Sequence, residues 1–129
     1  MIDGKKTQSH SIITNTFARL ANYGDVITYV INAIENVKPI IEIKKVRISG
    51  STQIVPSLLS KRRQETLAIR WIVEAAIQRR KTQPNWNFEQ CLLVEIVDAF
   101  NKTGVVRKKR DELHRLAEAN RGLAHYRWW

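Results

Sequence analysis

The residues of this chain with the clearest chemical purpose lie near its C-terminus. Four consecutive cations, Arg107, Lys108, Lys109 and Arg110, open a segment of helical periodicity. At 100° per residue, basic residues share one stripe of this helix and apolar residues share another, roughly a third of a turn away. The basic stripe consists of Arg107, Arg110, His114, Arg121 and His125, and the apolar stripe consists of Leu113, Leu116, Ala117, Leu123 and Ala124. We expect the apolar stripe to pack on a core and the basic stripe to face the phosphates of a polyanion.

The charge of the whole chain agrees with an anionic partner. The 129 residues include 22 Lys or Arg against 12 Asp or Glu, so the formal net charge is +10. A membrane surface is the competing partner. Basic residues are spread along the chain, however, and no apolar run approaches the roughly 20 residues that span a bilayer. The composition therefore favours nucleic acid and predicts no membrane association, and the N-terminal residues show no signal peptide.

The histidines and the cysteine do not predict an enzyme. His10 lies near the N-terminus, while His114 and His125 are flanked by cations, so no convergent catalytic site is expected. His114 and Glu118, one helical turn apart, are better explained by a solvated helix face than by an acid–base pair. The single cysteine, Cys91, excludes a disulfide framework and a thiolate metal site, and we expect it in the core. The chain is therefore predicted to have no catalytic residues, no metal, no cofactor and no small-molecule substrate.

The periodicity predicts a mainly α fold in a single domain, residues 1–129. The expected architecture is a helical bundle of about five helices with a protruding two-stranded β-hairpin arm at about residues 40–55. The helices are expected at Thr7 to Ala21, from the N-cap Asp25 to Pro39, at Ser60 to Arg80, from the capping box Asn87-x-x-Gln90 to near Gly104, and in the basic C-terminal segment. Trp71 lies within an apolar helical pattern and is expected in the core.

The hairpin arm and the third helix carry further candidate phosphate ligands. Lys44, Lys45 and Arg47 lie on the first strand, where they either contact phosphates or protect a sheet edge from aggregation. Arg62 and Arg63 follow Lys61 at a helix start, where the positive end of the helix dipole disfavours cations. A phosphate that bridges these side chains would offset the unfavourable interaction. Arg70 is a further candidate, although Glu74 lies one turn later and an ordinary surface ion pair is the alternative.

The terminal segment and several other blocks resemble the small-subunit ribosomal protein seven family. The terminal match is Arg-Lys-Lys-Arg-x-x-x-His-Arg-x-Ala-Glu-Ala-Asn-Arg-x-x-Ala-His-Tyr-Arg-Trp. The other blocks are Asp3-Gly4-Lys5-Lys6, Glu35 to Pro39, Gly50-x-x-x-x-Val55-Pro56, Arg63 to Ala76, and Asp98-Ala99, in family order and over nearly the whole chain. The resemblance implies a helical bundle with a β-ribbon that binds the 3′ major domain of small-subunit ribosomal RNA, starts assembly of the head and lies near the messenger exit path.

The resemblance also implies RNA contacts and partners. Carried over by position, the contact residues are Lys5, Lys6, Arg47, Arg63, Arg70, Arg107, Lys108, Lys109, Arg110, Arg115 and Arg127. The residue patterns add Lys44, Lys45, Arg62 and Arg121. The expected partners are small-subunit ribosomal RNA and neighbouring head proteins, with messenger RNA nearby.

Departures from the bacterial pattern point to one branch of the family. The chain begins at the family's Asp-Gly-Lys-Lys, the ribbon reads Lys45-Val46-Arg47-Ile48-Ser49-Gly50, and the chain ends at Trp128-Trp129. The ending and the ribbon, with the Ile- and Asn-rich composition, resemble mitochondrial members, so a mitochondrial ribosome is the expected location, with a plastid or the bacterial cytoplasm as alternatives. The alternative function is that of an architectural DNA-binding protein with a basic β-ribbon.

Overall fold

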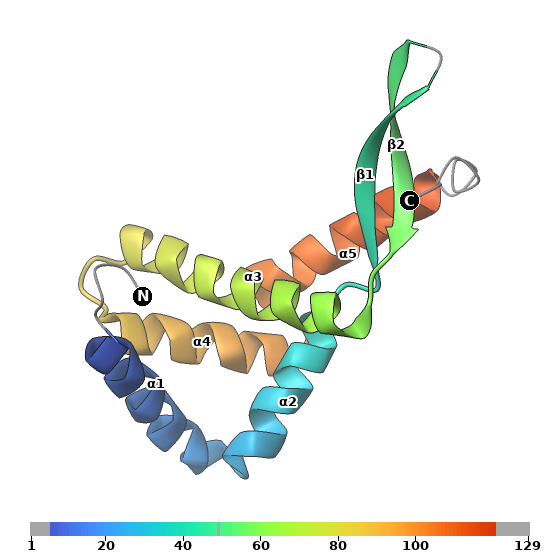
Figure 1. Ribbon diagram of the computed structural model, residues 1–129. Helices are drawn as coiled ribbons and strands as arrows, with labels where there is room; N and C mark the ends of the chain where they lie inside the picture. The colour runs from blue at the N-terminus through green and yellow to red at the C-terminus, as the bar shows by residue number, and fades with distance from the viewer. Residues whose placement is uncertain (1–5, 49, 121–129) are drawn as a thin grey trace.

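The computed structural model describes residues 6–48 and 50–120, and it confirms the predicted class of fold. Within those ranges the elements are α1 (Lys6–Leu20), a 3₁₀ turn η2 (Ala21–Tyr23), α2 (Val26–Val37), β1 (Ile41–Ile48), β2 (Ser51–Leu58), α3 (Lys61–Thr82), α4 (Phe88–Phe100) and α5 (Gly104–Ala119). Figure 1 shows a helical body from which the β1–β2 hairpin projects, with α5 extending toward the same end.

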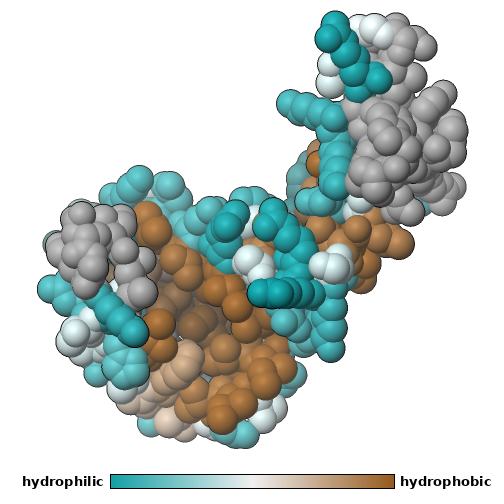
Figure 2. All heavy atoms as spheres, in the orientation of Figure 1, coloured by the Kyte–Doolittle hydropathy of each residue, from teal (hydrophilic) through white to brown (hydrophobic). Residues whose placement is uncertain are grey.

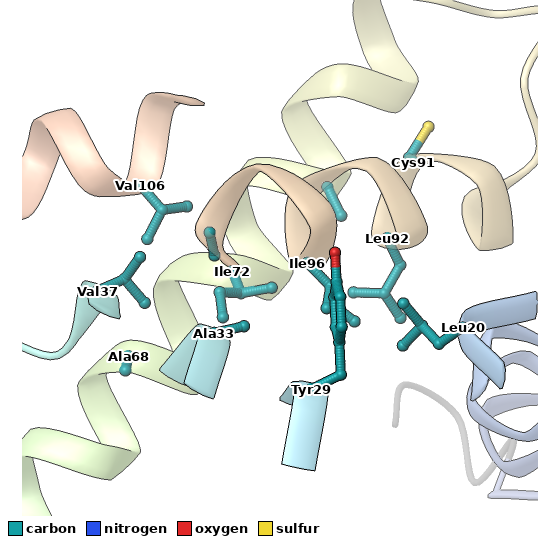
Figure 3. Packing of buried hydrophobic residues seen from close by; sticks show 12 residues of the cluster. Leu20, Tyr29, Ala33, Val37, Ala68, Ile72, Cys91, Leu92, Ile96 and Val106 are labelled. Atoms are coloured by element: carbon teal, nitrogen blue, oxygen red, sulfur yellow. The ribbon is translucent and has the colours of Figure 1, made fainter. Parts of the chain in front are cut away.

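The core forms around α4, which packs against the other four helices. Leu92 and Ile96 point from α4 toward Tyr29 and Ala33 of α2, while Cys91 points to the other side of α4 (Figure 3); all three belong to the buried hydrophobic cluster. The ring of Tyr29 stacks on Phe100 with 3.9 Å between the ring centroids. The prediction that Cys91 is a core residue is confirmed, since its side chain is fully buried. A thiol in this position packs as a small hydrophobic group.

The face between α1, α2 and α3 is strongly apolar. Figure 2 shows a hydrophobic hollow there, and Ile13, Phe17, Ile69 and Val73 are among the side chains that line it. Each of these four is more than a third exposed, Ile69 by half. The helices of the body therefore leave part of the apolar interior uncovered within the described residues. No described helix combines the length and the apolar character needed to cross a membrane.

Helix boundaries follow local capping chemistry, with one difference from the prediction. The expected capping box is present. Asn87 Oδ1 accepts from the backbone N–H of Gln90 at 2.9 Å, and Gln90 Oε1 accepts from the backbone N–H of Asn87 at 3.1 Å. Asp25 occupies the N-cap position of α2, but its carboxylate accepts from the hydroxyl of Thr28. The prediction that α4 runs to near Gly104 is wrong: the helix ends at Phe100, and Gly104 opens α5 with φ at 86°. Only glycine adopts such a φ without strain.

The arm is longer than its sequence predicts. The antiparallel register runs from Ile41 opposite Leu58 to Ile48 opposite Ser51, so the second strand continues past Pro56. Proline is tolerated there because a two-stranded sheet has outer edges at which a missing N–H leaves no ladder bond unmade. Val55 and Ser57 are buried beside it, which shows that the root of the arm is part of the folded body.

Candidate nucleic-acid interface

Helix α5 is hydrogen-bonded to the segment that joins α2 to the arm. The guanidinium of Arg107 donates to the carbonyl of Asn36, and Nε of Arg110 donates to the carbonyl of Lys38 at 3.2 Å. Asp111 lies 3.3 Å from Nε of Arg107 and 2.9 Å from Nη1 of Arg110, so both guanidinium groups also have an anionic neighbour. Charge-assisted bonds of this kind are stronger than neutral ones. The two arginines therefore fix the direction of the chain as it leaves α2.

His114 completes the attachment one turn further along α5. Its Nε2 accepts a hydrogen bond from the backbone N–H of Ile40 at 3.0 Å, which requires the neutral imidazole. Burial lowers the pKa of His114, and the nearby charge of Arg110 lowers it further. The prediction of a solvated face at His114 is wrong, because the imidazole is half-buried against the root of the arm.

The basic stripe predicted for α5 is therefore not the exposed face of the helix. The side chains of Arg107 and Arg110 are 24% and 20% exposed, whereas those of Lys109 and Arg115 are 51% and 69% exposed. Lys108 is also exposed. The expectation that the stripe lies open to phosphate is thus wrong for Arg107, Arg110 and His114, since backbone groups of the arm root satisfy them. The periodicity located the stripe but did not reveal this partner.

Lys109 and Arg115 are exposed, but each already interacts with a nearby side chain. Nζ of Lys109 lies 4.9 Å from the ring centroid of Trp71 and 3.9 Å from Glu74, the residue that the sequence pairs with Arg70. Trp71 packs against the core as expected but is only half-buried. Arg115 pairs with Glu112, and this hydrogen bond lowers the pKa of the carboxyl group. Exposed pairs such as these contribute little to stability and are easily exchanged for phosphate.

The remaining predicted contacts on the third helix and the arm are exposed. Arg62 and Arg63 lie in the first turn of α3, which contains no acidic residue, and Arg70 is exposed two turns later. On β1, Lys45 and Arg47 are exposed on one face of the arm. Lys44 lies on the opposite face, 3.9 Å from Glu42. The arm therefore presents cations on both of its faces.

The elements that carry most of these cations adjoin one another in the fold. The first turn of α3 follows directly from β2, and α5 packs along β1 (Figure 1). The arm, α3 and α5 therefore adjoin one another at the root of the arm. Lys6 does not join this group, because it begins α1 at the opposite side of the body. Lys5, Arg121, His125 and Arg127 lie outside the described residues. None of the described residues form a group of three potential metal ligands.

Sequence reasoning missed one buried ionic cluster. Nε of Arg79 on α3 lies 2.7 Å from Oε1 of Glu95 on α4, and Nη2 of Arg79 lies 3.6 Å from Asp98. Glu95 is only 2% exposed, and its second oxygen, Oε2, has no hydrogen-bond partner. The residues of this cluster belong to different helices, so no spacing along the chain indicates the pairing.

A helical body with a projecting basic arm is the architecture expected of a structural protein that binds a polyanion. Comparison with known families makes the class specific. The chain belongs to the family described as ribosomal protein S7p/S5e, whose model matches residues 1–121. Family membership agrees with the expectation that the chain is a structural protein and not an enzyme.

Individual relatives support the expected branch of the family. The chain is 60% identical over 129 residues to the small ribosomal subunit protein uS7m of Marchantia polymorpha, matching all of this chain and 56% of that protein. It is 47% identical to uS7m of Triticum aestivum, with 87% of that relative covered, and 44% identical to the bacterial uS7 of Dictyoglomus turgidum, with 81% covered. This chain thus spans little more than half of the Marchantia protein. The suffix of the plant names denotes the mitochondrial form, which confirms the resemblance to mitochondrial members.

Proposed function

We propose that this chain is a structural constituent of the small subunit of the mitochondrial ribosome. In this proposal it binds the 3′ major domain of small-subunit ribosomal RNA, organises assembly of the head beside neighbouring head proteins, and lies near the messenger exit path. Family membership and the names of the mitochondrial relatives support the ribosomal role. The head domain and the messenger path are what the family resemblance implies.

The observation that carries the proposal is the presence of exposed cations on three adjoining elements. Lys45 and Arg47 on the arm, Arg62 and Arg63 at the start of α3, and Lys108 on α5 are all exposed, and the three elements adjoin one another. Phosphates of a folded RNA lie on several strands at once, and a surface of this shape contacts them from more than one side. Contacts of this type position the protein and carry little sequence information.

Arg107 and Arg110 take a different role in this proposal. Their guanidinium groups hold the root of the arm, so they orient the phosphate-binding residues and contribute less to direct contact. Lys6, Lys44, Arg70, Lys109 and Arg115 are additional contacts, as are Lys5, Arg121 and Arg127.

The salt dependence of binding tests the proposal. If about six to ten phosphates are contacted, the affinity for a head-domain RNA fragment should fall on the order of a thousandfold or more between 50 and 200 mM salt. Binding would be measured at both concentrations with duplex DNA as a competitor. A nearly flat salt dependence contradicts the proposal, and a preference for the duplex favours the architectural DNA-binding alternative.

A further inference from the structure

A groove runs between α3 and α5 on this otherwise basic protein, and its chemistry differs from that of the proposed RNA surface. It has a volume of about 580 Å³ and is lined by residues of both helices, with Glu95 of α4 among them. Trp71 contributes an aromatic wall and Val105 an apolar one. Lys109 spans the groove, between the ring of Trp71 and the carboxylate of Glu74.

The buried carboxylate of Glu95 is incompletely paired. Oε1 accepts from Arg79 at 2.7 Å, but Oε2 is buried without a hydrogen-bond partner. An ionised carboxylate can accept about four hydrogen bonds, and a buried polar atom that lacks a partner is unfavourable. A ligand group in this groove that donates N–H bonds would therefore be stabilised by Oε2.

The residues at the groove indicate the kind of donor. The residues that line the groove include two carboxylates, Glu74 and Glu95, and two cations, Arg79 and Lys109, so the lining is balanced in charge. The chain as a whole carries +10. Lys109 already places its ammonium beside the ring of Trp71 and the carboxylate of Glu74, so this position accommodates a cation. An arginine side chain fits best, since its planar guanidinium stacks on aromatic rings and donates several N–H bonds to carboxylates.

We propose that the groove between α3 and α5 binds an arginine side chain of a neighbouring protein. The guanidinium stacks against Trp71 in place of the Lys109 ammonium and donates to Oε2 of Glu95, while Glu74 attracts it at the rim. The groove is thus a protein-docking site on a chain whose other exposed ionic surface is suited to RNA. The proposal does not depend on RNA binding, because Lys109 is the one lining residue that is also a proposed RNA contact.

The first test titrates the isotopically labelled protein with two blocked tripeptides, N-acetyl-Gly-Arg-Gly-amide and its citrulline analogue. Citrulline has nearly the shape of arginine but no charge. The indole N–H of Trp71 and the side-chain amide of Gln78, which also lines the groove, report occupation. We expect saturable shifts with the arginine peptide and binding of the citrulline peptide weaker by about tenfold or more. Equal shifts with both peptides, or none with either, would overturn the proposal and leave a merely hydrated groove.

Two variants and an RNA probe localise the effect. Val105→Trp should fill the mouth of the groove and abolish the shifts, because Val105 lines the groove and is 60% exposed. Ile27→Trp is the matched control on α2, since Ile27 is 71% exposed and lies outside the groove. Glu74→Gln should weaken binding of the arginine peptide several-fold without affecting the packing of the core. Hexauridylate should leave the Gln78 amide signal unchanged, and a shift of that signal with this RNA would assign the groove to RNA instead.

Discussion

The backbone N–H of Ile40 donates to Nε2 of His114 at 3.0 Å, so the residue that precedes the arm is tied to the middle of α5. The two residues are 74 positions apart in sequence. Together with the carbonyl contacts of Arg107 and Arg110, this bond makes the direction of the arm depend on α5. The arm's orientation is thus set by polar bonds that pH and mutation can alter.

Lowering the pH should loosen the root of the arm. The pKa of His114 in the folded state lies below its ordinary value of 6.5, mainly because of burial. Above that value both folded and unfolded states are neutral and the stabilisation is fully present. As the pH falls below 6.5 toward the folded pKa, the unfolded state gains the proton first and stability is lost. The protection factor of the Ile40 amide, which corrects for the intrinsic slowing of exchange at lower pH, should fall over this range. His114→Gln, which keeps an acceptor without titrating, should remove the pH dependence, while His10→Gln should not.

Neighbouring cations on α5 should have different effects on stability. Arg110→Ala removes a charge-assisted bond to the carbonyl of Lys38 and should lower the free energy of unfolding by about 1.5–3 kcal/mol. Lys108→Ala removes an exposed charge and should change it by less than about 0.5 kcal/mol. Urea denaturation measures both values. Similar losses for the two variants would show that Arg110 does not support the arm. RNA affinity should show the opposite order when it is measured under conditions in which both variants are folded. Lys108→Ala should weaken binding more than Arg110→Ala and should reduce the slope of log affinity against log salt.

Replacing Lys44, Lys45 and Arg47 by Gln should distinguish phosphate contact from edge protection. If all three touch phosphate, the slope of log affinity against log salt should fall by about three units. The variant should still discriminate cognate from scrambled RNA as the parent does, because phosphate contacts carry no sequence information. Unchanged affinity with increased aggregation would assign the three cations to edge protection. Affinities at two salt concentrations and light scattering decide between these outcomes.

Gly104→Ala should destabilise the junction between α4 and α5. The φ of Gly104 is 86°, and a Cβ placed there would lie 2.9 Å from Cβ of Asp98. Backbone strain alone is worth about 1–3 kcal/mol, and the close approach adds to it. Gly50→Ala is the matched control, because Gly50 has φ at 82° but nothing within 4 Å of the added Cβ. Thermal unfolding of the two variants should therefore show a larger loss at position 104, and equal losses would argue against the steric contribution.

Much of the architecture follows from the sequence alone. Hydrophobic periodicity located the helices, the Asn87 capping box located the start of α4, and β-branched residues located the arm, because these signals arise from neighbours along the chain. The family blocks identified the ribosomal class for the same reason: side chains at fixed spacing are visible without a fold. The end of the second strand was missed since proline usually stops a strand, and only the open edge of a two-stranded sheet permits Pro56.

The roles of individual cations required the tertiary structure. Arg107 and Lys108 are adjacent in a uniform basic run, yet one is bound to the carbonyl of Asn36 and the other is exposed. Periodicity assigns residues to a face of a helix, but it does not say what that face meets. The partners of α5 at the arm root are backbone carbonyl and N–H groups, which every residue possesses and which therefore leave no mark in the sequence. For the same reason the pairing of Arg79 with Glu95 appeared only when α3 and α4 were brought together.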